Sequence, residues 1–145
     1  ADLRLACAGA GKIGLPEVQL GVLPGTGGTQ RLARLVGKAR ALELMATGRT
    51  MDFQEAAEIG LVNHVFQRER FWDEVRDFAH QFVPPARASK AVGLIKRAVQ
   101  TGLEVGFEHG LALERELQQQ LFTSEDAGEG LAAYLGKRPP QFKGR

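Results

Sequence analysis

The sequence lacks several features that would place a protein in a specialised class. Its single cysteine, Cys7, has no second cysteine for an internal disulfide, so we expect a small buried thiol in a reducing compartment. No apolar run approaches the roughly 18 residues of a membrane-spanning helix. The formal net charge is only +2, without a block of like charge suited to nucleic acid or a membrane surface. We therefore expect a soluble cytoplasmic protein with neither nucleic acid nor a membrane as partner.

Motifs for metal and nucleotide binding are missing as well. His64, His80 and His109 stand far apart, with no cysteine or carboxylate at the spacing of metal ligands, so we expect no bound metal. The glycine cluster at 25–28 is followed by no Gly-Lys-Ser/Thr and lacks the G-x-G-x-x-G spacing. ATP and dinucleotides are therefore not expected ligands. The simplest interpretation of such a cluster is a tight turn before a helix.

Strand-like runs occur only in the first half of the sequence, whereas helical spacing dominates the second. The double proline Pro84-Pro85 separates these parts, so we expect two regions, 1–83 and 84–145. Amphipathic helices without strands cannot close a core unaided, so those of the second region must pack on the first region or on another subunit. The predicted strands are 3–7, 17–23 and 61–66, and the predicted helices are 29–36, 39–46, 53–59, 71–82, 87–101, 104–122 and 125–135.

Local chemistry marks the ends of two of these helices. Asp52 and Glu55 have the spacing of a capping box at the start of the helix 53–59. Ser124 is suited to the N-cap of the last helix, and the acidic residues 125–126 suit the positive end of its dipole. The polar C-terminal stretch RPPQFKGR has no helical or strand-like pattern, so we expect a loose tail.

Glu17 is the most unusual residue in the sequence. It is a lone carboxylate between apolar residues, just before a run of glycines, in the stretch GLPEVQLGVLPGTGGTQRL at 14–32. A charged side chain close to buried backbone is costly unless it is paired, hydrogen-bonded or able to take up a proton. From the residues alone, an exposed glutamate at a strand end or a helix-cap partner is the simpler interpretation, and an acid that exchanges a proton with a ligand is the alternative.

Three segments in the same order resemble the crotonase, or enoyl-CoA hydratase/isomerase, superfamily. They are GLPEVQLGVLPGTGGTQRLARLVG, ALELMATGRTMDFQEAAEIGLVNHV and SEDAGEGLAAYLGKRPPQFKGR, and the similarity covers essentially the whole chain. The resemblance implies an α/β fold, with residues 1–83 as the last turns of a spiral of ββα units. Residues 84–145 would then be a mainly helical region that packs trimers. We accordingly expect a homo-trimer or a homo-hexamer.

The resemblance also implies an enzyme of fatty acid or related acyl-CoA degradation, such as β-oxidation. Its reaction would be hydration of the 2,3 double bond of a 2-enoyl-CoA thioester, with Glu17 as one of two catalytic acids. That reaction needs a water at C3, a proton at C2 and stabilisation of the thioester oxygen. A carboxyl group in an apolar pocket can keep a proton to deliver near neutral pH. No cofactor is implied, because coenzyme A enters as part of the acyl-CoA substrate.

Further residues are implied to bind that substrate. Pro16, Leu23 and Gly25 are expected to contact the acyl-CoA near Glu17. By resemblance, Tyr134 lies near the adenine and Lys137 near the phosphates of CoA bound to a neighbouring subunit, where a lysine is a suitable point cation. The alternative for Lys137 is that a basic residue at a helix C-terminus only complements the helix dipole.

The family's other glutamate and both backbone N–H groups of its oxyanion hole lie before the position of Ala1. We therefore expect that these residues belong to a longer polypeptide and are inactive alone, because losing even one such donor costs about a hundredfold in rate. An organellar targeting segment further upstream is the alternative to a cytoplasmic location. An enoyl-CoA delta isomerase, which moves a proton between C2 and C4, is the first alternative function. A catalytically inactive piece that serves as an oligomerisation module is the second.

Overall fold

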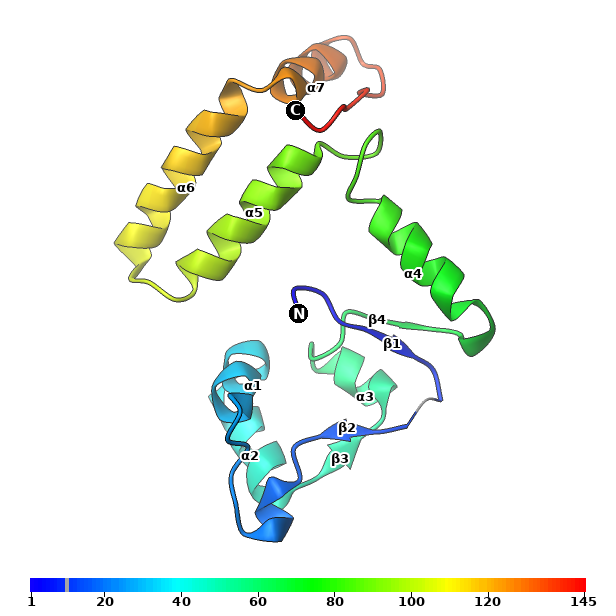
Figure 1. Ribbon diagram of the computed structural model, residues 1–145, viewed down its shortest axis with the longest axis vertical. Helices are drawn as coiled ribbons and strands as arrows, with labels where there is room; N and C mark the ends of the chain where they lie inside the picture. The colour runs from blue at the N-terminus through cyan, green and yellow to red at the C-terminus, as the bar shows by residue number, and fades with distance from the viewer. Residues whose placement is uncertain (10) are drawn as a thin grey trace. The chain divides into compact units, whose positions relative to one another are not determined.

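The computed structural model describes residues 1–9 and 11–145. Contacts divide the chain into two compact units, Ala1–Val75 and Arg76–Arg145, and each is described by itself (Figure 1). The boundary predicted from the double proline falls within the second of these units and stays a prediction. The elements are β1 (Leu5–Cys7), β2 (Ile13–Gly14), η1 (Glu17–Leu20), α1 (Gly28–Val36), α2 (Lys38–Thr47), β3 (Thr50–Met51), α3 (Phe53–Glu58), β4 (His64–Phe66), η2 (Arg68–Arg70), α4 (Phe71–His80), α5 (Ser89–Gly102), α6 (Phe107–Phe122) and α7 (Glu125–Leu135).

The first unit contains two small sheets. Strands β1 and β4 pair in parallel, with Leu5 opposite His64, whereas β2 and β3 pair antiparallel, with Ile13 opposite Met51 (Figure 1). The strands expected at 3–7 and 61–66 are therefore present but shorter. The second one begins late because the N–H groups of residues 61–62 both donate to the carbonyl of Ala56, at 2.8 and 3.0 Å, in a turn after α3.

The prediction of a strand at 17–23 is wrong, because this segment forms the 3-10 helix η1 and a turn. Gly21 has a φ of 73° and donates its N–H to the carbonyl of Val18 at 3.0 Å, while Val22 donates to Glu17 at 3.3 Å. These local bonds leave the segment without a partner ladder. The apolar residues that suggested a strand are largely exposed, up to 81% for Leu20.

The helices predicted for the first unit are confirmed as α1, α2 and α3. Asp52 caps α3 as predicted, since its Oδ1 accepts the N–H of Glu55 at 2.8 Å. The reciprocal half of the capping box is replaced by an ion pair, in which the Glu55 carboxylate lies 2.7 Å from the guanidinium of Arg49. Asp52 therefore fixes the start of α3, and Glu55 ties this first turn to Arg49, the residue before β3.

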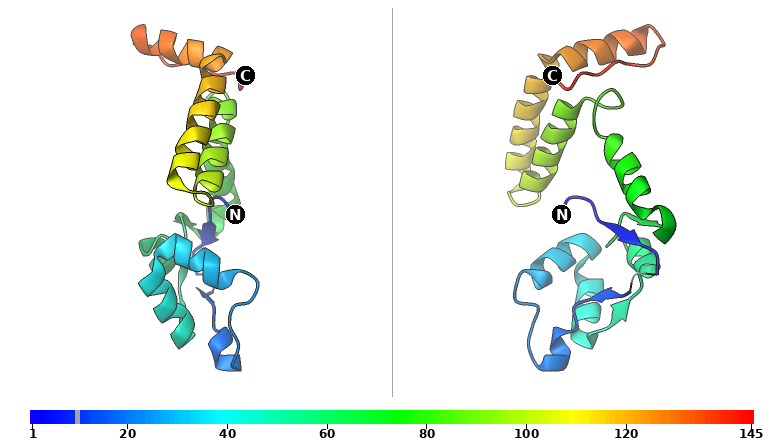
Figure 2. Two further views of the ribbon diagram at one scale, coloured as in Figure 1. Left: turned by 90° about the vertical axis from the view of Figure 1, so that its left-hand side faces the viewer. Right: turned by 45° about the vertical axis from the view of Figure 1, so that its right-hand side comes forward.

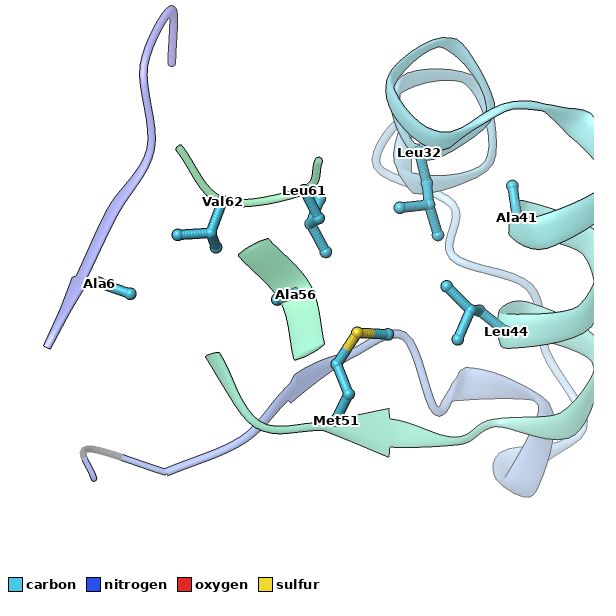
Figure 3. Packing of buried hydrophobic residues seen from close by; sticks show 8 residues of the cluster. All are labelled: Ala6, Leu32, Ala41, Leu44, Met51, Ala56, Leu61 and Val62. Atoms are coloured by element: carbon cyan, nitrogen blue, oxygen red, sulfur yellow. The ribbon is translucent and has the colours of Figure 1, made fainter. Parts of the chain in front are cut away.

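One apolar cluster forms the core of the first unit. Figure 3 shows Leu32, Leu44, Met51 and Leu61 pointing toward one another from α1, α2, β3 and the turn after α3. Each such side chain contributes about 1.5–3 kcal/mol by leaving water. Cys7 lies at the edge of this unit and is only half-buried, so the predicted buried thiol is partly exposed. The cluster is completed by Ala6, Ala41, Ala56 and Val62.

In the second unit, α5 and α6 lie side by side, and a Cβ at Gly110 would be 3.6 Å from the Cα of Gly102 (Figure 2). Ser124 caps α7 as predicted, accepting the N–H of Ala127 at 3.2 Å. Within the described residues, the buried apolar side chains of this unit are Leu117 and Ala133. Such a small core agrees with the expectation that these helices need further packing surfaces. No helix among the described residues has the length and apolar character to cross a membrane.

The C-terminal tail is held against α7 instead of being loose (Figure 2). Asp126 is 3% exposed, and its two carboxylate oxygens accept the N–H groups of Lys143 and Gly144, both at 2.7 Å. Its own N–H donates to the carbonyl of Arg145 at 3.0 Å. An acid that suited the helix dipole therefore also fixes the end of the chain.

Candidate active site

The 3-10 helix η1 positions Glu17 by resting on the C-terminal end of α2. The side-chain amide of Gln19 donates to the carbonyl of Gly48 at 3.2 Å. Gly48 has a left-handed φ of 64°, and a Cβ there would lie 2.9 Å from Cγ1 of Val18. Only glycine combines that backbone conformation with so close an approach. The packing of η1 against α2 therefore depends on Gly48.

Glu17 is half-buried at the first position of η1, directly after Pro16. Its Oε2 is buried and has no hydrogen-bond partner among the residues that the structure describes. Buried polar atoms are nearly always hydrogen-bonded, and an orphan of this kind calls for a specific explanation. The position favours a polar group supplied from outside these residues, such as water or a ligand.

The segment that carries Glu17 is closed at its base by a contact at the start of α1. A Cβ on Gly28 would lie 2.7 Å from Cβ of Pro24 and 3.1 Å from Cδ1 of Leu15. Leu15 and Pro24 therefore meet at the same glycine, and residues 16–23 project as a compact loop. The expected tight turn is confirmed by Gly27, whose left-handed φ of 91° precedes α1.

The substrate-binding residues expected near Glu17 lie on this loop and at its base. Pro16 is exposed and caps η1, with its carbonyl accepting the N–H of Gln19 at 2.9 Å. Leu23 is 67% exposed at the other end of the loop, and Gly25 is exposed in the turn that follows. The loop thus joins an acid with a buried oxygen to accessible apolar surface.

An apolar pocket of about 180 Å³ lies in the first unit beside this loop. Its lining includes Leu15 from the base of the loop and Leu44 and Met51 from the core. Glu17 is not among the residues that line it, so the acid lies beyond the pocket. The remaining lining residues are Ile13, Gly14, Gly28, Arg31, Leu32, Leu35 and Leu61.

The expected CoA-binding residues lie in the second unit, at the end of α7. Tyr134 is 82% exposed and Lys137 is exposed just beyond the helix. The neighbouring Arg138 pairs with Glu129, with Nη1–Oε1 and Nη2–Oε2 distances of 2.6 and 2.8 Å. The hydrogen bonds from Arg138 and from the backbone N–H of Gln141 lower the pKa of Glu129 from 4.5 to about 2.

Sequence reasoning missed the contacts that three side chains make around these sites. Gln19 anchors η1, Glu129 holds Arg138, and Asp126 fixes the tail. The only available signal was the spacing of Asp126 and Glu129, which places two acids on one face of a helix. Within the described parts of the chain, no three His, Cys, Asp or Glu side chains gather in the manner of a metal site.

Comparison with solved structures gives the class of protein that this fold defines. The crystal structure of an enoyl-CoA hydratase from Geobacillus kaustophilus has a TM-score of 0.90 and 52% identity, and the match covers 100% of this chain and 54% of that one. The crotonase fold expected from the sequence is thus confirmed. Its few strands and many helices are consistent with the C-terminal portion of that fold.

Sequence comparison then gives the family. Residues 1–145 match the enoyl-CoA hydratase/isomerase family, and the chain belongs to it. A Mycobacterium tuberculosis protein named probable enoyl-CoA hydratase is 43% identical over 141 residues, 97% of this chain and 54% of that protein. The mitochondrial methylglutaconyl-CoA hydratase of Rattus norvegicus is 40% identical over 147 residues, 99% of this chain and 46% of that protein. The chain therefore spans about half the length of the curated relatives that it matches.

Proposed function

We propose that this chain is the part of an enoyl-CoA hydratase that supplies one catalytic acid, Glu17. The enzyme adds water across the 2,3 double bond of a 2-enoyl-CoA in fatty acid or related acyl-CoA degradation. Family membership and the names of the relatives support the reaction class. The observation that carries the proposal is the buried Oε2 of Glu17, which has no partner in the described residues and stands where the resemblance places an acid.

In the proposed reaction, the oxygen of water bonds to C3 as the π electrons of the double bond move toward C2 and the thioester oxygen. Glu17 then gives its proton to C2 and becomes a carboxylate, while the proton lost by the water passes to the carboxylate of a second acidic residue. That acid and the N–H donors for the thioester oxygen come from residues outside this chain. The second residue then releases this proton and Glu17 takes one up, by exchange with water, so that both return to their starting states, and no cofactor takes part.

The proposed substrate contacts divide between the two units. Pro16 and Gly25 flank the thioester end, and Leu23 offers apolar surface to the acyl group. Tyr134 and Lys137 contact the adenine and the phosphates of CoA bound by a neighbouring subunit of a homo-trimer or homo-hexamer. Exposed apolar side chains on the second unit, among them Ile95 and Leu135, support such an assembly. A cytoplasmic location completes the proposal.

The test replaces Glu17 by Gln in the natural full-length protein and follows hydration of crotonyl-CoA by absorbance. We expect kcat to fall by about a hundredfold to ten-thousandfold with KM nearly unchanged, because the amide has the same shape but its N–H protons are not acidic enough to be transferred. Glu58→Gln, on the exposed side of α3, is the matched control.

Each other outcome has a definite meaning. Turnover like that of the wild type would remove Glu17 from the mechanism. Isomerisation of a 3-enoyl-CoA without hydration would replace the hydratase by the isomerase. Absence of both activities from the wild-type protein, with trimers on gel filtration, would replace the enzyme by an oligomerisation module.

A further inference from the structure

Helix α7 ends in a turn whose left-handed residue is a lysine. The N–H of Arg138 donates to the carbonyl of Ala133 at 3.0 Å, and Lys137 between Gly136 and Arg138 has a φ of 48°. This helix ending ordinarily has glycine at the left-handed position, because a Cβ there is strained. In the described chain, Lys137 is the one residue other than glycine with a positive φ. A strained backbone persists only where the surrounding structure holds it.

Glu129 supplies the contacts that hold the chain on the C-terminal side of Lys137. Its carboxylate forms the two-pronged pair with the guanidinium of Arg138, and its Oε1 also accepts the N–H of Gln141 at 2.7 Å. A single carboxylate on α7 therefore binds both Arg138, next to Lys137, and the backbone of Gln141 further along the tail. The pKa of Glu129, lowered to about 2, keeps this carboxylate charged throughout the neutral range.

The cationic side chains that follow α7 differ in whether an acid of that helix pairs with them. Glu125 takes up two cations, with its Oε2 at 3.1 Å from Nε of Arg145 and 4.0 Å from Nζ of Lys143. Glu129 takes up Arg138. Among the described residues, no acid pairs with Lys137, which lies exposed beside the 82% exposed Tyr134. The acids of α7 therefore leave one free ammonium, on the residue with the strained backbone.

We infer that Glu129 is a positioning residue for Lys137: it fixes the left-handed turn and neutralises Arg138, so that a single ammonium is presented to the phosphates of bound acyl-CoA. The inference rests on the proposed role of Lys137 in CoA binding. A purely structural clamp between α7 and the tail is the competing explanation. The two differ in what they predict for substrates with and without the nucleotide.

The experiment compares kcat/KM for crotonyl-CoA with that for crotonyl-pantetheine, which has the thioester and the pantetheine arm but no nucleotide. The natural full-length protein is measured as wild type, Lys137→Gln, Glu129→Gln and the double variant. Glu125→Gln is the matched control, because it removes another charged contact between α7 and the tail. Thermal unfolding of each variant reports on folding separately.

We expect Lys137→Gln to reduce the ratio of the two kcat/KM values by about tenfold, the effect of losing one charge-assisted hydrogen bond. Glu129→Gln should reduce the ratio by about threefold or more, through KM for crotonyl-CoA with kcat retained. In the Lys137→Gln background, Glu129→Gln should have no further effect on the ratio. Glu125→Gln should leave the ratio unchanged.

The possible results distinguish the CoA-binding role of Lys137 from the positioning role of Glu129. An unchanged ratio in Lys137→Gln would remove the CoA role of Lys137 and the inference with it. A reduced ratio in Lys137→Gln but not in Glu129→Gln, or an equal loss with both substrates in Glu129→Gln, would overturn the positioning role alone. If Glu129→Gln does not fold, Arg138→Lys, which keeps the charge but not the two-pronged geometry, is subject to the same expectations.

Discussion

Replacing Gly48 by alanine tests whether the packing of η1 against α2 determines the position of Glu17. The new Cβ would lie 2.9 Å from Cγ1 of Val18 and 3.2 Å from Cγ of Gln19, at a φ of 64°. The left-handed backbone costs about 1–2 kcal/mol for a residue with a Cβ. Relief of the overlap costs about 1–3 kcal/mol more. We therefore expect Gly48→Ala to lower the free energy of unfolding by about 2–5 kcal/mol.

The assay is urea unfolding together with crotonyl-CoA hydration in the natural full-length protein. Gly60→Ala is the matched control, because Gly60 also has a positive φ of 78° but nothing within 4 Å of the added Cβ. That control should lose only the backbone part and keep its activity. Gly48→Ala should lose activity in addition, because the overlap displaces η1 and with it Glu17. Val18→Ala, placed in the Gly48→Ala chain, removes the closest contact and should recover part of both losses.

Equal losses of stability in Gly48→Ala and Gly60→Ala would refute this reasoning, since the contact with η1 would then contribute nothing. Wild-type kcat in a destabilised Gly48→Ala protein would show that the packing of η1 against α2 does not determine the position of Glu17.

Two further predictions concern the second unit. Asp126→Asn should destabilise the protein by about 1–3 kcal/mol, because the amide turns a donor toward one of the two partly buried N–H groups that the carboxylate accepts, and hydrogen exchange should then accelerate at Lys143 and Gly144; unchanged exchange at both amides would contradict it. For Glu129, the lowered folded-state pKa of about 2 means that its contribution to stability is present above about pH 4.5 and is lost as the pH falls toward 2. The difference in unfolding midpoint between wild type and Glu129→Gln should therefore be constant from pH 5 upward and shrink below about pH 4.5, and a difference that grows on acidification would show the opposite sign of linkage.

The helices were predictable because the information that defines them is local. Gly37 and Gly48 marked the ends of α1 and α2, and the N-caps at Asp52 and Ser124 were found at the expected positions, whereas α2 buries Ala41 and Leu44 and leaves the apolar residues Ala39 and Leu42 of its predicted face exposed. Each of these signals lies within a few residues of the feature that it predicts. The family resemblance added the fold, which local patterns could not supply.

The errors arose where distant residues or unusual exposure decide the structure. The apolar residues between Glu17 and Leu23 suggested a strand, but Pro16 and Gly21 bend the chain into η1 and leave those side chains exposed. The tail was expected to be loose because its own residues show no helical or strand-like pattern. It is ordered instead by hydrogen bonds to acids of α7 more than ten residues away. Nothing in the spacing of Glu129 and Arg138 announces that pair, so the candidate site could be predicted only in part.

The parallel pairing of β1 with β4 has a kinetic consequence. The N–H of Arg4 donates to the side chain of Asn63, a contact between residues 59 positions apart. Bringing such distant parts together costs loop-closure entropy before any contact repays it, whereas neighbouring helices such as α5 and α6 meet through a short connection. We therefore expect α5 and α6 to pair early, and the joining of β1 to β4 to be the late step that completes Ala1–Val75.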